Sequence, residues 1–266
     1  MIEISGDEHI PLAVDLDGTL VFTDLLHESL VRLVRNEPFC AWQGIAWLLR
    51  GKACLKERLA DASEFDPSLL PYNAEFVSFL RAEKAQGREL LLCTGAHEQL
   101  AEAVADYLGI FSGVIATRSD RNLTGQAKAE ALIAAYGEGG FDYAGNAAID
   151  LAVWRHARRA IVVNAAPPLR KKVAALTVVE RVFPSPHRFW TACLKVMRPY
   201  QWLKNLLLFA PCIAAHKLDD PHVLPLLAAA FVAFGLCAAA VYTLNDILDA
   251  VNDRRHPRKR FRPRAQ

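Results

Sequence analysis

The chain has 266 residues, of which 53% are hydrophobic and 23% are charged, and its formal net charge is +2 at pH 7. That length accommodates one large domain or two unequal parts, and the high apolar fraction beside many charges indicates a soluble segment joined to an apolar one. The small net charge argues against a nucleic-acid-binding protein.

The six cysteines are widely scattered and form no C-x-x-C pair. This usage predicts reduced thiols in a cytosolic setting, without a disulfide framework or a zinc site. The first ten residues, MIEISGDEHI, carry acids and no apolar run, so we expect no signal peptide. The first part of the chain is therefore expected to stay in the cytoplasm.

From Pro11 to about Phe183, short apolar runs alternate with longer helical patterns. The expected buried strands are Leu12–Leu16, Leu90–Thr94, Gly113–Ala116, Phe141–Ala144 and Ala160–Val163. The expected helices between them are Asn73–Gln86, His97–Leu108, Gln126–Tyr136 and Ile149–Ala157. This alternation predicts an α/β fold with a doubly wound parallel sheet, in a domain over residues 1–183.

A helical segment of about residues 24–72 interrupts this alternation between the first two strands. We interpret it as a small helical cap over the carboxyl edge of the sheet. Arg50, Lys52 and Lys56 are candidate anion contacts on this cap. The alternative for each is a solvated charge on a helix surface.

After residue 183 the alternation stops, and residues 184–197 have the composition of a linker. Val223–Leu244 contains 22 residues without a formal charge, which suits a membrane span. The alternative is a helix buried in a large soluble core. Trp202–Ala215 is a shorter second candidate, interrupted by Lys204 and Pro211. Residues 198–266 are therefore expected to form a membrane region with two candidate transmembrane helices.

The strongest chemical signal is Asp15-Leu16-Asp17-Gly18-Thr19, directly after an apolar strand. Side chains at the carboxyl ends of strands meet at the ligand-binding edge of such sheets. Two carboxylates spaced i, i+2 there suit phosphoryl transfer, one as nucleophile and the other as general acid and base. A surface turn is the alternative for this motif alone.

Three further pieces follow the motif at other strand ends. Thr94 and Gly95 offer a hydroxyl and backbone N–H groups to a phosphoryl oxygen, and Lys128 opens a helix where it would neutralise phosphate. Asn146 and Asp150 supply oxygen ligands for a hard divalent cation. Taken singly, Thr94 is more typical of a helix cap and Lys128 of a solvated surface.

In this order, the four pieces resemble the haloacid dehalogenase superfamily from Leu12 to about Ala166. The resemblance implies a Rossmannoid fold, an Mg²⁺-dependent phosphatase, and a phosphorylated small molecule or lipid-linked phosphate as substrate. It implies Asp15 as nucleophile, Asp17 as general acid and base, and Thr94 and Lys128 as phosphate binders. Mg²⁺ would be held by Asp15, by the backbone carbonyl of Asp17 and by the fourth motif. The insert is similar to the cap of the phosphoserine-phosphatase-like branch.

One position departs from that family, which usually has Gly-Asp where this chain has Gly145-Asn146. An amide oxygen coordinates Mg²⁺ with one negative charge fewer, so we expect a lower metal affinity. Asp150 remains as a ligand, directly or through water. The alternative function is a catalytically weak domain that regulates or scaffolds a membrane transferase.

The C-terminal stretch places four polar residues on one helical face at the end of the long apolar run: Asn245, Asp246, Asp249 and Asp253. Clustered carboxylates at a membrane surface favour an Mg²⁺–diphosphate site, although a solvated helix end is the alternative. With RPYQWLKN before it and HPRKRFRP after it, this region resembles the start of the UbiA prenyltransferase superfamily. Within that superfamily it is most similar to decaprenyl-phosphate phosphoribosyltransferases, which implies polyprenyl phosphate as a partner.

The resemblance covers only the first part of such a transferase, so we expect no transfer activity from this polypeptide alone. Seven basic residues lie between positions 254 and 264, and Arg198 and Lys204 precede the first candidate span. The positive-inside tendency then places both ends in the cytoplasm. The expected location is the cell inner membrane, with the phosphatase-like domain on the cytoplasmic side, and we expect the basic tail to meet anionic lipid rather than nucleic acid.

Overall fold

The computed structural model describes residues 10–36, 43–62, 65–118, 122–185, 197, 199–217 and 220–255. The chain divides into two compact units, Met1–Pro186 and His187–Gln266. The four candidate pieces for phosphoryl transfer all belong to the first unit, and the aspartate motif near the C-terminus belongs to the second.

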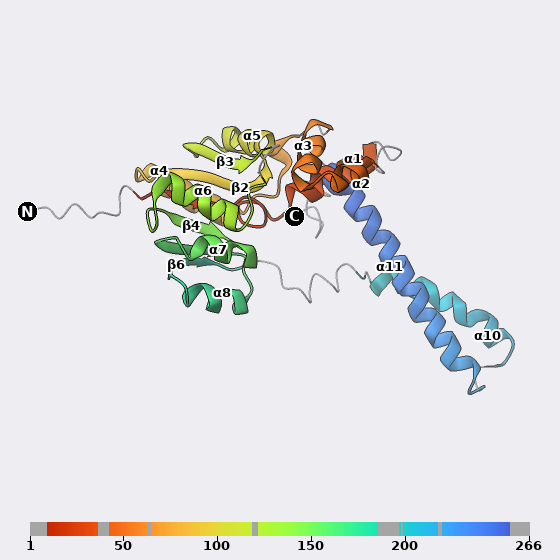
Figure 1. Ribbon diagram of the computed structural model, residues 1–266. Helices are drawn as coiled ribbons and strands as arrows, with labels where there is room; N and C mark the ends of the chain where they lie inside the picture. Colours follow the sequence, from red (N-terminus) through yellow and green to blue (C-terminus); the bar gives the residue numbers. More distant parts are fainter. Residues whose placement is uncertain are drawn as a thin grey trace, which may run out of the picture. The chain divides into compact units, whose positions relative to one another are not determined.

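The first unit is built on one sheet in which every strand pairs in parallel with its neighbours. Its strands are β1 (Leu12–Val14), β2 (Leu90–His97), β3 (Gly113–Thr117), β4 (Asp142–Gly145), β5 (Arg159–Val163) and β6 (Val178–Phe183). Their order across the sheet is β3-β2-β1-β4-β5-β6. The predicted α/β class with a doubly wound parallel sheet is confirmed (Figure 1).

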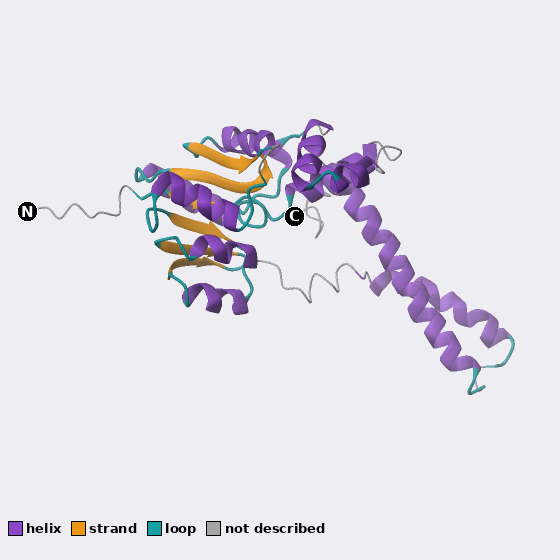
Figure 2. Cartoon of the chain, in the orientation of Figure 1, coloured by secondary structure: helices purple, strands orange, loops and turns teal. Residues whose placement is uncertain are grey.

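Helices cover both faces of this sheet (Figure 2). Alternate residues of each strand point to opposite faces, so Leu12 and Val14 join one core and Ala13 joins the other. The first core receives α4 (Ala74–Ala85) and α5 (Glu98–Leu108). The second receives α6 (Gln126–Tyr136), α7 (Leu151–Trp154) and α8 (Pro167–Ala174). Burial on both faces explains why these strands are continuous apolar runs.

Two elements differ from the sequence prediction. Strand β6 and helix α8 were not expected, and β6 is an edge strand whose residues are mostly exposed and include Glu180 and Arg181. Because the strand lacks an apolar run, hydrophobic periodicity does not reveal it. The helix expected over Ile149–Ala157 is shorter, since only a 3₁₀ turn, η2 (Ala148–Asp150), and α7 form there.

The strand order reverses at β1, whose neighbours are β2 and β4. Chain connections leave to opposite faces on either side of such a point, which opens a crevice at the carboxyl ends of the strands. The backbone continues the pairing past β1, because Asp15 N–H donates to the carbonyl of Ala144 at 2.9 Å. The fold thus sets the ends of β1 and β4 side by side.

The predicted cap consists of α1 (Leu25–Asn36), α2 (Gln43–Leu49), α3 (Lys52–Ala62) and the 3₁₀ turn η1 (Pro67–Leu69). A small apolar cluster holds its helices together: Leu33, Leu55 and Leu59, with Leu26 and Trp47 packed against them. The cap therefore has a core of its own beside the sheet domain.

The second unit contains a 3₁₀ segment, η3 (Pro199–Phe209), a short helix, α10 (Ala210–Ala214), and a long helix, α11 (Val223–Arg255). The ring of Trp202 packs on Gly235 so closely that a Cβ there would lie 2.7 Å from it, which explains the glycine inside α11. Phe231 makes edge contacts with the rings of Trp202 and Phe209. η3 and α11 therefore pack as a hairpin.

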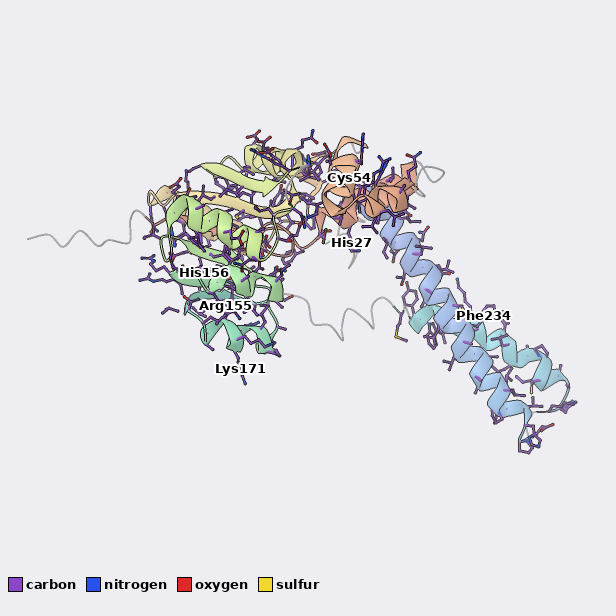
Figure 3. All side chains as sticks on the ribbon, in the orientation of Figure 1. His27, Cys54, Arg155, His156, Lys171 and Phe234 are labelled. Carbon is purple, nitrogen blue, oxygen red and sulfur yellow. The ribbon has the colours of Figure 1, made fainter. Side chains whose placement is uncertain are left out.

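Within the described residues, one helix is long and apolar enough to cross a membrane, over Val223–Asp249, with a mean hydropathy of 2.3 and only 6% of its most apolar stretch buried. Phe234 of α11, labelled in Figure 3, is 61% exposed. The second candidate span forms η3 and α10 and is shorter than a bilayer-crossing helix requires. Arg198 and the basic residues from 256 onward lie outside the described residues.

Candidate active site

A cavity of about 590 Å³ opens at the carboxyl edge of the sheet, between the strand ends and the cap. It is lined by six of the residues predicted for the site: Asp15, Asp17, Gly95, Lys128, Asn146 and Asp150. These residues come from four separate stretches of the chain, so the convergence of strand ends expected from the sequence is present.

A buried chain of hydrogen bonds runs from the nucleophile candidate into the domain. Lys128 Nζ donates to Asp15 Oδ1 at 2.7 Å and to the hydroxyl of Tyr143 at 2.9 Å. The Tyr143 hydroxyl in turn donates to Asp150 Oδ1 at 2.9 Å, and Lys128 Nζ lies 3.7 Å from the same oxygen. The Thr19 hydroxyl donates to Asp15 Oδ2 at 3.3 Å. The lysine thus holds one oxygen of Asp15 in a fixed direction.

The second oxygen of Asp150 orders the loop after β4. Asp150 Oδ2 accepts hydrogen bonds from the backbone N–H groups of Asn146 at 3.2 Å and Ala147 at 3.0 Å. Asp150 is 1% exposed, so these backbone groups, together with Tyr143, meet a carboxylate that is withdrawn from water. In this arrangement Asp150 positions Asn146.

Asp17 links the site to the cap, because its Oδ1 accepts a hydrogen bond of 2.9 Å from the backbone N–H of Leu25, the first residue of α1. Burial raises the pKa of Asp17 to about 7, and the charges of Asp24 and Asp15 add to the rise. A carboxyl group with a pKa near neutrality suits general acid and base chemistry at pH 7.

Burial also raises the pKa of Asp15, to about 6, with Lys128 opposing the rise and Asp150 adding to it. Burial alone would lower the pKa of Lys128, but the charges of Asp15 and Asp150 raise it above the usual range. The lysine therefore stays charged beside Asp15 and favours the carboxylate form that a nucleophile needs.

The second predicted piece lies inside β2. Thr94 is fully buried and does not line the cavity; its hydroxyl oxygen accepts a hydrogen bond of 3.0 Å from the backbone N–H of Ala96. Gly95 does line the cavity, and a Cβ there would lie 2.9 Å from Thr124 Cγ2. Only glycine lets the strand end and the loop before α6 approach this closely.

Of the three cationic cap candidates, Lys56 reaches the site. Lys56 Nζ donates to the backbone carbonyl of Gly95 at 2.5 Å and to Asn122 Oδ1 at 2.8 Å. Arg50 is exposed and does not line the cavity. The side chain of Lys52 lies outside the described part of the structure.

The donor set fits a hard divalent cation. The amide of Asn146 lies against the loop that carries both aspartates, since a Cβ on Gly18 would fall 2.0 Å from Asn146 Nδ2, and Gly18 has a φ of +73°. The Asp15 carboxylate, the Asp17 carbonyl and the Asn146 amide oxygen are oxygen donors of the kind that Mg²⁺ prefers. The described residues contain no group of three His, Cys, Asp or Glu side chains suited to a metal ion.

The aspartate motif near the C-terminus lies on α11. Asn245 Nδ2 donates to Asp249 Oδ2 at 3.1 Å, as the i, i+4 spacing predicts, and Asp246 is on the same helix. Asp253 also falls within α11, but its side chain lies outside the described residues.

Tyr143 is the functional residue that the sequence patterns did not indicate. It is fully buried in β4, where its ring packs edge-on against Trp154. A tyrosine in an otherwise apolar buried strand needs a partner for its hydroxyl, and that requirement is the signal that points to it.

Part of the first unit matches a known protein family. Residues 12–142 match the haloacid dehalogenase-like hydrolase family. A solved structure of phosphoserine phosphatase in its apo form is also similar to the chain. The similarity covers 66% of this chain and 94% of that one, with 17% identity and a TM-score of 0.46.

The matches to two curated relatives include residues outside this family match. Uncharacterized protein y4nM of Sinorhizobium fredii is 34% identical over 260 residues, which cover 96% of this chain and 50% of the relative. Decaprenyl-phosphate phosphoribosyltransferase of Mycobacterium tuberculosis is 44% identical over 84 residues, which cover 30% of this chain and 28% of the relative. The chain spans half or less of the length of these relatives. With its parallel sheet, cap and convergent strand-end residues, the first unit carries a haloacid dehalogenase-like hydrolase domain.

Proposed function

We propose that this domain is an Mg²⁺-dependent phosphatase that hydrolyses phosphomonoesters through an aspartyl-phosphate. The observation that carries the proposal is the contact between Asp15 and Lys128, 2.7 Å apart in the same cavity as Asp17. A carboxylate held by a buried ammonium beside a second carboxyl group of raised pKa is the arrangement that nucleophilic phosphoryl transfer requires.

In the first step an oxygen of Asp15 attacks phosphorus, and the bond from phosphorus to the substrate alcohol breaks as the acyl phosphate forms. Asp17 gives its proton to the departing alcohol oxygen. In the second step Asp17 takes a proton from water, whose oxygen attacks phosphorus and releases inorganic phosphate and the Asp15 carboxylate. Lys128 neutralises charge on the phosphoryl oxygens throughout, and Gly95 offers its backbone N–H to one of them.

Asp15, the Asp17 carbonyl and Asn146 would hold Mg²⁺, with Asp150 orienting the Asn146 loop. When bound, the cation offsets negative charge on the phosphoryl group and on Asp15. The amide of Asn146 carries no negative charge for the cation. It therefore favours the second candidate function, a catalytically weak domain that regulates or scaffolds a membrane transferase.

The test is a phosphomonoester panel assayed with the full chain in detergent, in Mg²⁺ and after chelation. We expect Mg²⁺-dependent release of phosphate that Asp15→Asn abolishes while the protein remains folded. Asp106→Asn is the matched control, because Asp106 is an exposed aspartate of α5 that does not line the cavity. Equal turnover in Asp15→Asn would eliminate the aspartyl-phosphate mechanism, and no turnover on any ester would favour the scaffold.

The second unit supports a membrane location for this activity. α11 has the length and composition of a bilayer span, and its apolar side chains are exposed. We therefore place the chain at the inner membrane, with the phosphatase domain and the Asn245–Asp249 region facing the cytoplasm. Resistance to extraction by alkaline carbonate tests this location; release into the soluble fraction would contradict it.

The similarity of the C-terminal region to a phosphoribosyltransferase suggests a lipid-linked phosphate and polyprenyl phosphate as partners. Asp246 and Asp249 would take part in binding an Mg²⁺–diphosphate group, and Asp253 would extend that site by one helical turn. Since the similarity covers 28% of the transferase, we do not assign a transfer reaction to this chain.

A further inference from the structure

We infer that the phosphatase cavity takes a phosphomonoester whose alcohol is uncharged and largely apolar in the carbons next to the phosphate. This inference rests on the proposed function, since it names the substrate class of the same site. It follows from how polar and apolar side chains are divided between the walls of the cavity.

One wall carries the chemistry. Asp15, Asp17 and Lys128 stand at the sheet edge, and the polar side chains of His97, Asn122 and Thr124 lie beside them on the β2 side. The wall formed by the cap helices is different. Its described lining residues are four leucines, one serine and one lysine: Leu25, Leu26, Ser29, Leu48, Lys56 and Leu59.

Some apolar side chains that line the cavity are also exposed to solvent. Leu48 of α2 is 50% exposed and Ile149 is 56% exposed, although both line the cavity. Large apolar side chains that face water inside a cavity cost free energy until a ligand covers them, and they mark binding surfaces. The cavity of about 590 Å³ is of the size that holds a drug-sized ligand, so it has room for an alcohol as well as a phosphoryl group.

The charges on the cap wall disfavour a zwitterionic alcohol. Lys56 is tied to Gly95 and Asn122, and the described residues of the cap helices supply no carboxylate to the lining. Asp24 lines the cavity just before α1, and its Oδ1 accepts from the backbone N–H groups of Leu26 and His27. The described residues of these helices therefore offer no carboxylate to the ammonium group of an amino-acid phosphate, and its burial against them would cost desolvation free energy.

The experiment compares straight-chain alkyl phosphates from ethyl to hexyl with phosphoserine, using the full chain in Mg²⁺. A methylene group that leaves water raises affinity up to about fourfold. We expect kcat/KM to rise at least about tenfold from ethyl to hexyl phosphate, and phosphoserine to be the poorest substrate. An unchanged kcat/KM along the series, or a preference for phosphoserine, overturns the inference.

Two neighbouring leucines provide matched variants. Leu48→Ser removes an apolar group from the lining, whereas Leu49→Ser removes one that is 84% exposed and does not line the cavity. We expect the hexyl-to-ethyl ratio of kcat/KM to fall about threefold or more in Leu48→Ser and to stay unchanged in Leu49→Ser. An equal effect of both substitutions contradicts the assignment of the cap wall.

Binding of alkylphosphonates, which are not hydrolysed, separates this inference from the proposed function. Calorimetric titration of the full chain with ethyl- to hexylphosphonate measures the chain-length dependence without turnover. Affinity that rises with chain length in a protein that hydrolyses no ester supports the inference and rejects the phosphatase. Affinity that is independent of chain length, or absent at every length, overturns the inference.

Discussion

The side-chain amide of Asn164 donates a hydrogen bond of 2.8 Å to the backbone carbonyl of Gly18, 146 positions away in the sequence. Asn164 follows β5 and has a left-handed backbone with a φ of +52°, and Gly18 belongs to the loop that carries Asp15 and Asp17. The bond therefore fixes the loop between Asp17 and Thr19 from a strand that contributes nothing else to the site.

We expect Asn164→Gly to lower kcat about tenfold, because glycine keeps the left-handed backbone but loses the bond to Gly18. Asn164→Ala loses the same bond and adds backbone strain of about 1 kcal/mol. The two variants should thus share a loss of kcat and differ in the midpoint of thermal unfolding. Activity equal to wild type in Asn164→Gly would show that the loop holds its shape without this bond.

The Tyr143 hydroxyl stands between Lys128 and Asp150, and Tyr143→Phe removes it without changing the packing against Trp154. We expect the free energy of unfolding to fall by about 1–3 kcal/mol, the usual cost of leaving buried polar groups without a partner. We also expect kcat to fall about tenfold, since Lys128 loses one of the two groups that direct it at Asp15. Tyr136, the last residue of α6, packs against the second core and does not line the cavity, so Tyr136→Phe is the control and should change neither quantity.

Asn146→Asp should add a negative charge to the proposed Mg²⁺ site. We expect the Mg²⁺ concentration for half-maximal activity to fall about tenfold, which corresponds to about 1.4 kcal/mol of added attraction. In chelator the same variant should unfold at a lower temperature, because three carboxylates then repel one another without a cation. A half-saturation unchanged from wild type would mean that Asn146 does not touch the metal.

Much of this site was predictable because its residues follow from a repeated rule. Asp15, Gly95 and Asn146 each stand where a buried apolar run ends, and parallel strands bring such ends to one edge. The apolar runs therefore predicted that residues more than 100 positions apart in the sequence lie in one cavity.

What the sequence did not reveal depends on side-chain directions and on exposed strands. The role of Tyr143 requires knowing that its hydroxyl points between α6 and the turn after β4, and no sequence period carries that information. Strand β6 was not predicted because Glu180 and Arg181 interrupt its apolar residues, and five of its six residues are exposed or half-buried. Thr94 was expected at the phosphate, yet its hydroxyl oxygen accepts from Ala96 within β2, a local contact that spacing does not predict.

Substitution of Asp142, which does not line the cavity, should greatly lower the stability of the domain. It is fully buried at the start of β4, where its carboxylate binds the guanidinium groups of Arg88 and Arg158, the latter at 3.0 Å and 2.7 Å. Breaking a buried ion pair costs about 3–5 kcal/mol, so Asp142→Asn should lower the free energy of unfolding by about 3 kcal/mol.

The control for Asp142→Asn is Glu138→Gln. Glu138 is 69% exposed in its side chain and pairs with His156, labelled in Figure 3, at 2.8 Å. An exposed pair contributes at most about 1 kcal/mol. Chemical denaturation of both variants should therefore separate them clearly, and equal effects would contradict the role given to Asp142.

The raised pKa of Asp17 predicts how the metal-free protein responds to pH. The folded pKa is about 7, whereas an unfolded aspartate has a pKa of about 3.9, so between these values the folded state binds more protons than the unfolded state. The contribution of Asp17 to the free energy of unfolding must then fall as pH rises from about 4 to 7. Asp17→Asn removes this dependence and keeps an oxygen to accept from Leu25 N–H.

In chelator we therefore expect Asp17→Asn to unfold at the same temperature as wild type near pH 4. At pH 8 it should be more stable by about 2 kcal/mol, since each pKa unit corresponds to about 1.4 kcal/mol and Asp17 remains partly accessible to water. Asp106→Asn should show no such pH-dependent difference from wild type. Saturating Mg²⁺ should narrow the difference at pH 8, because the bound cation offsets the charge of the nearby Asp17 carboxylate, which the asparagine variant lacks. A variant that is less stable than wild type at pH 8 in chelator would show that burial does not destabilise the carboxylate at position 17.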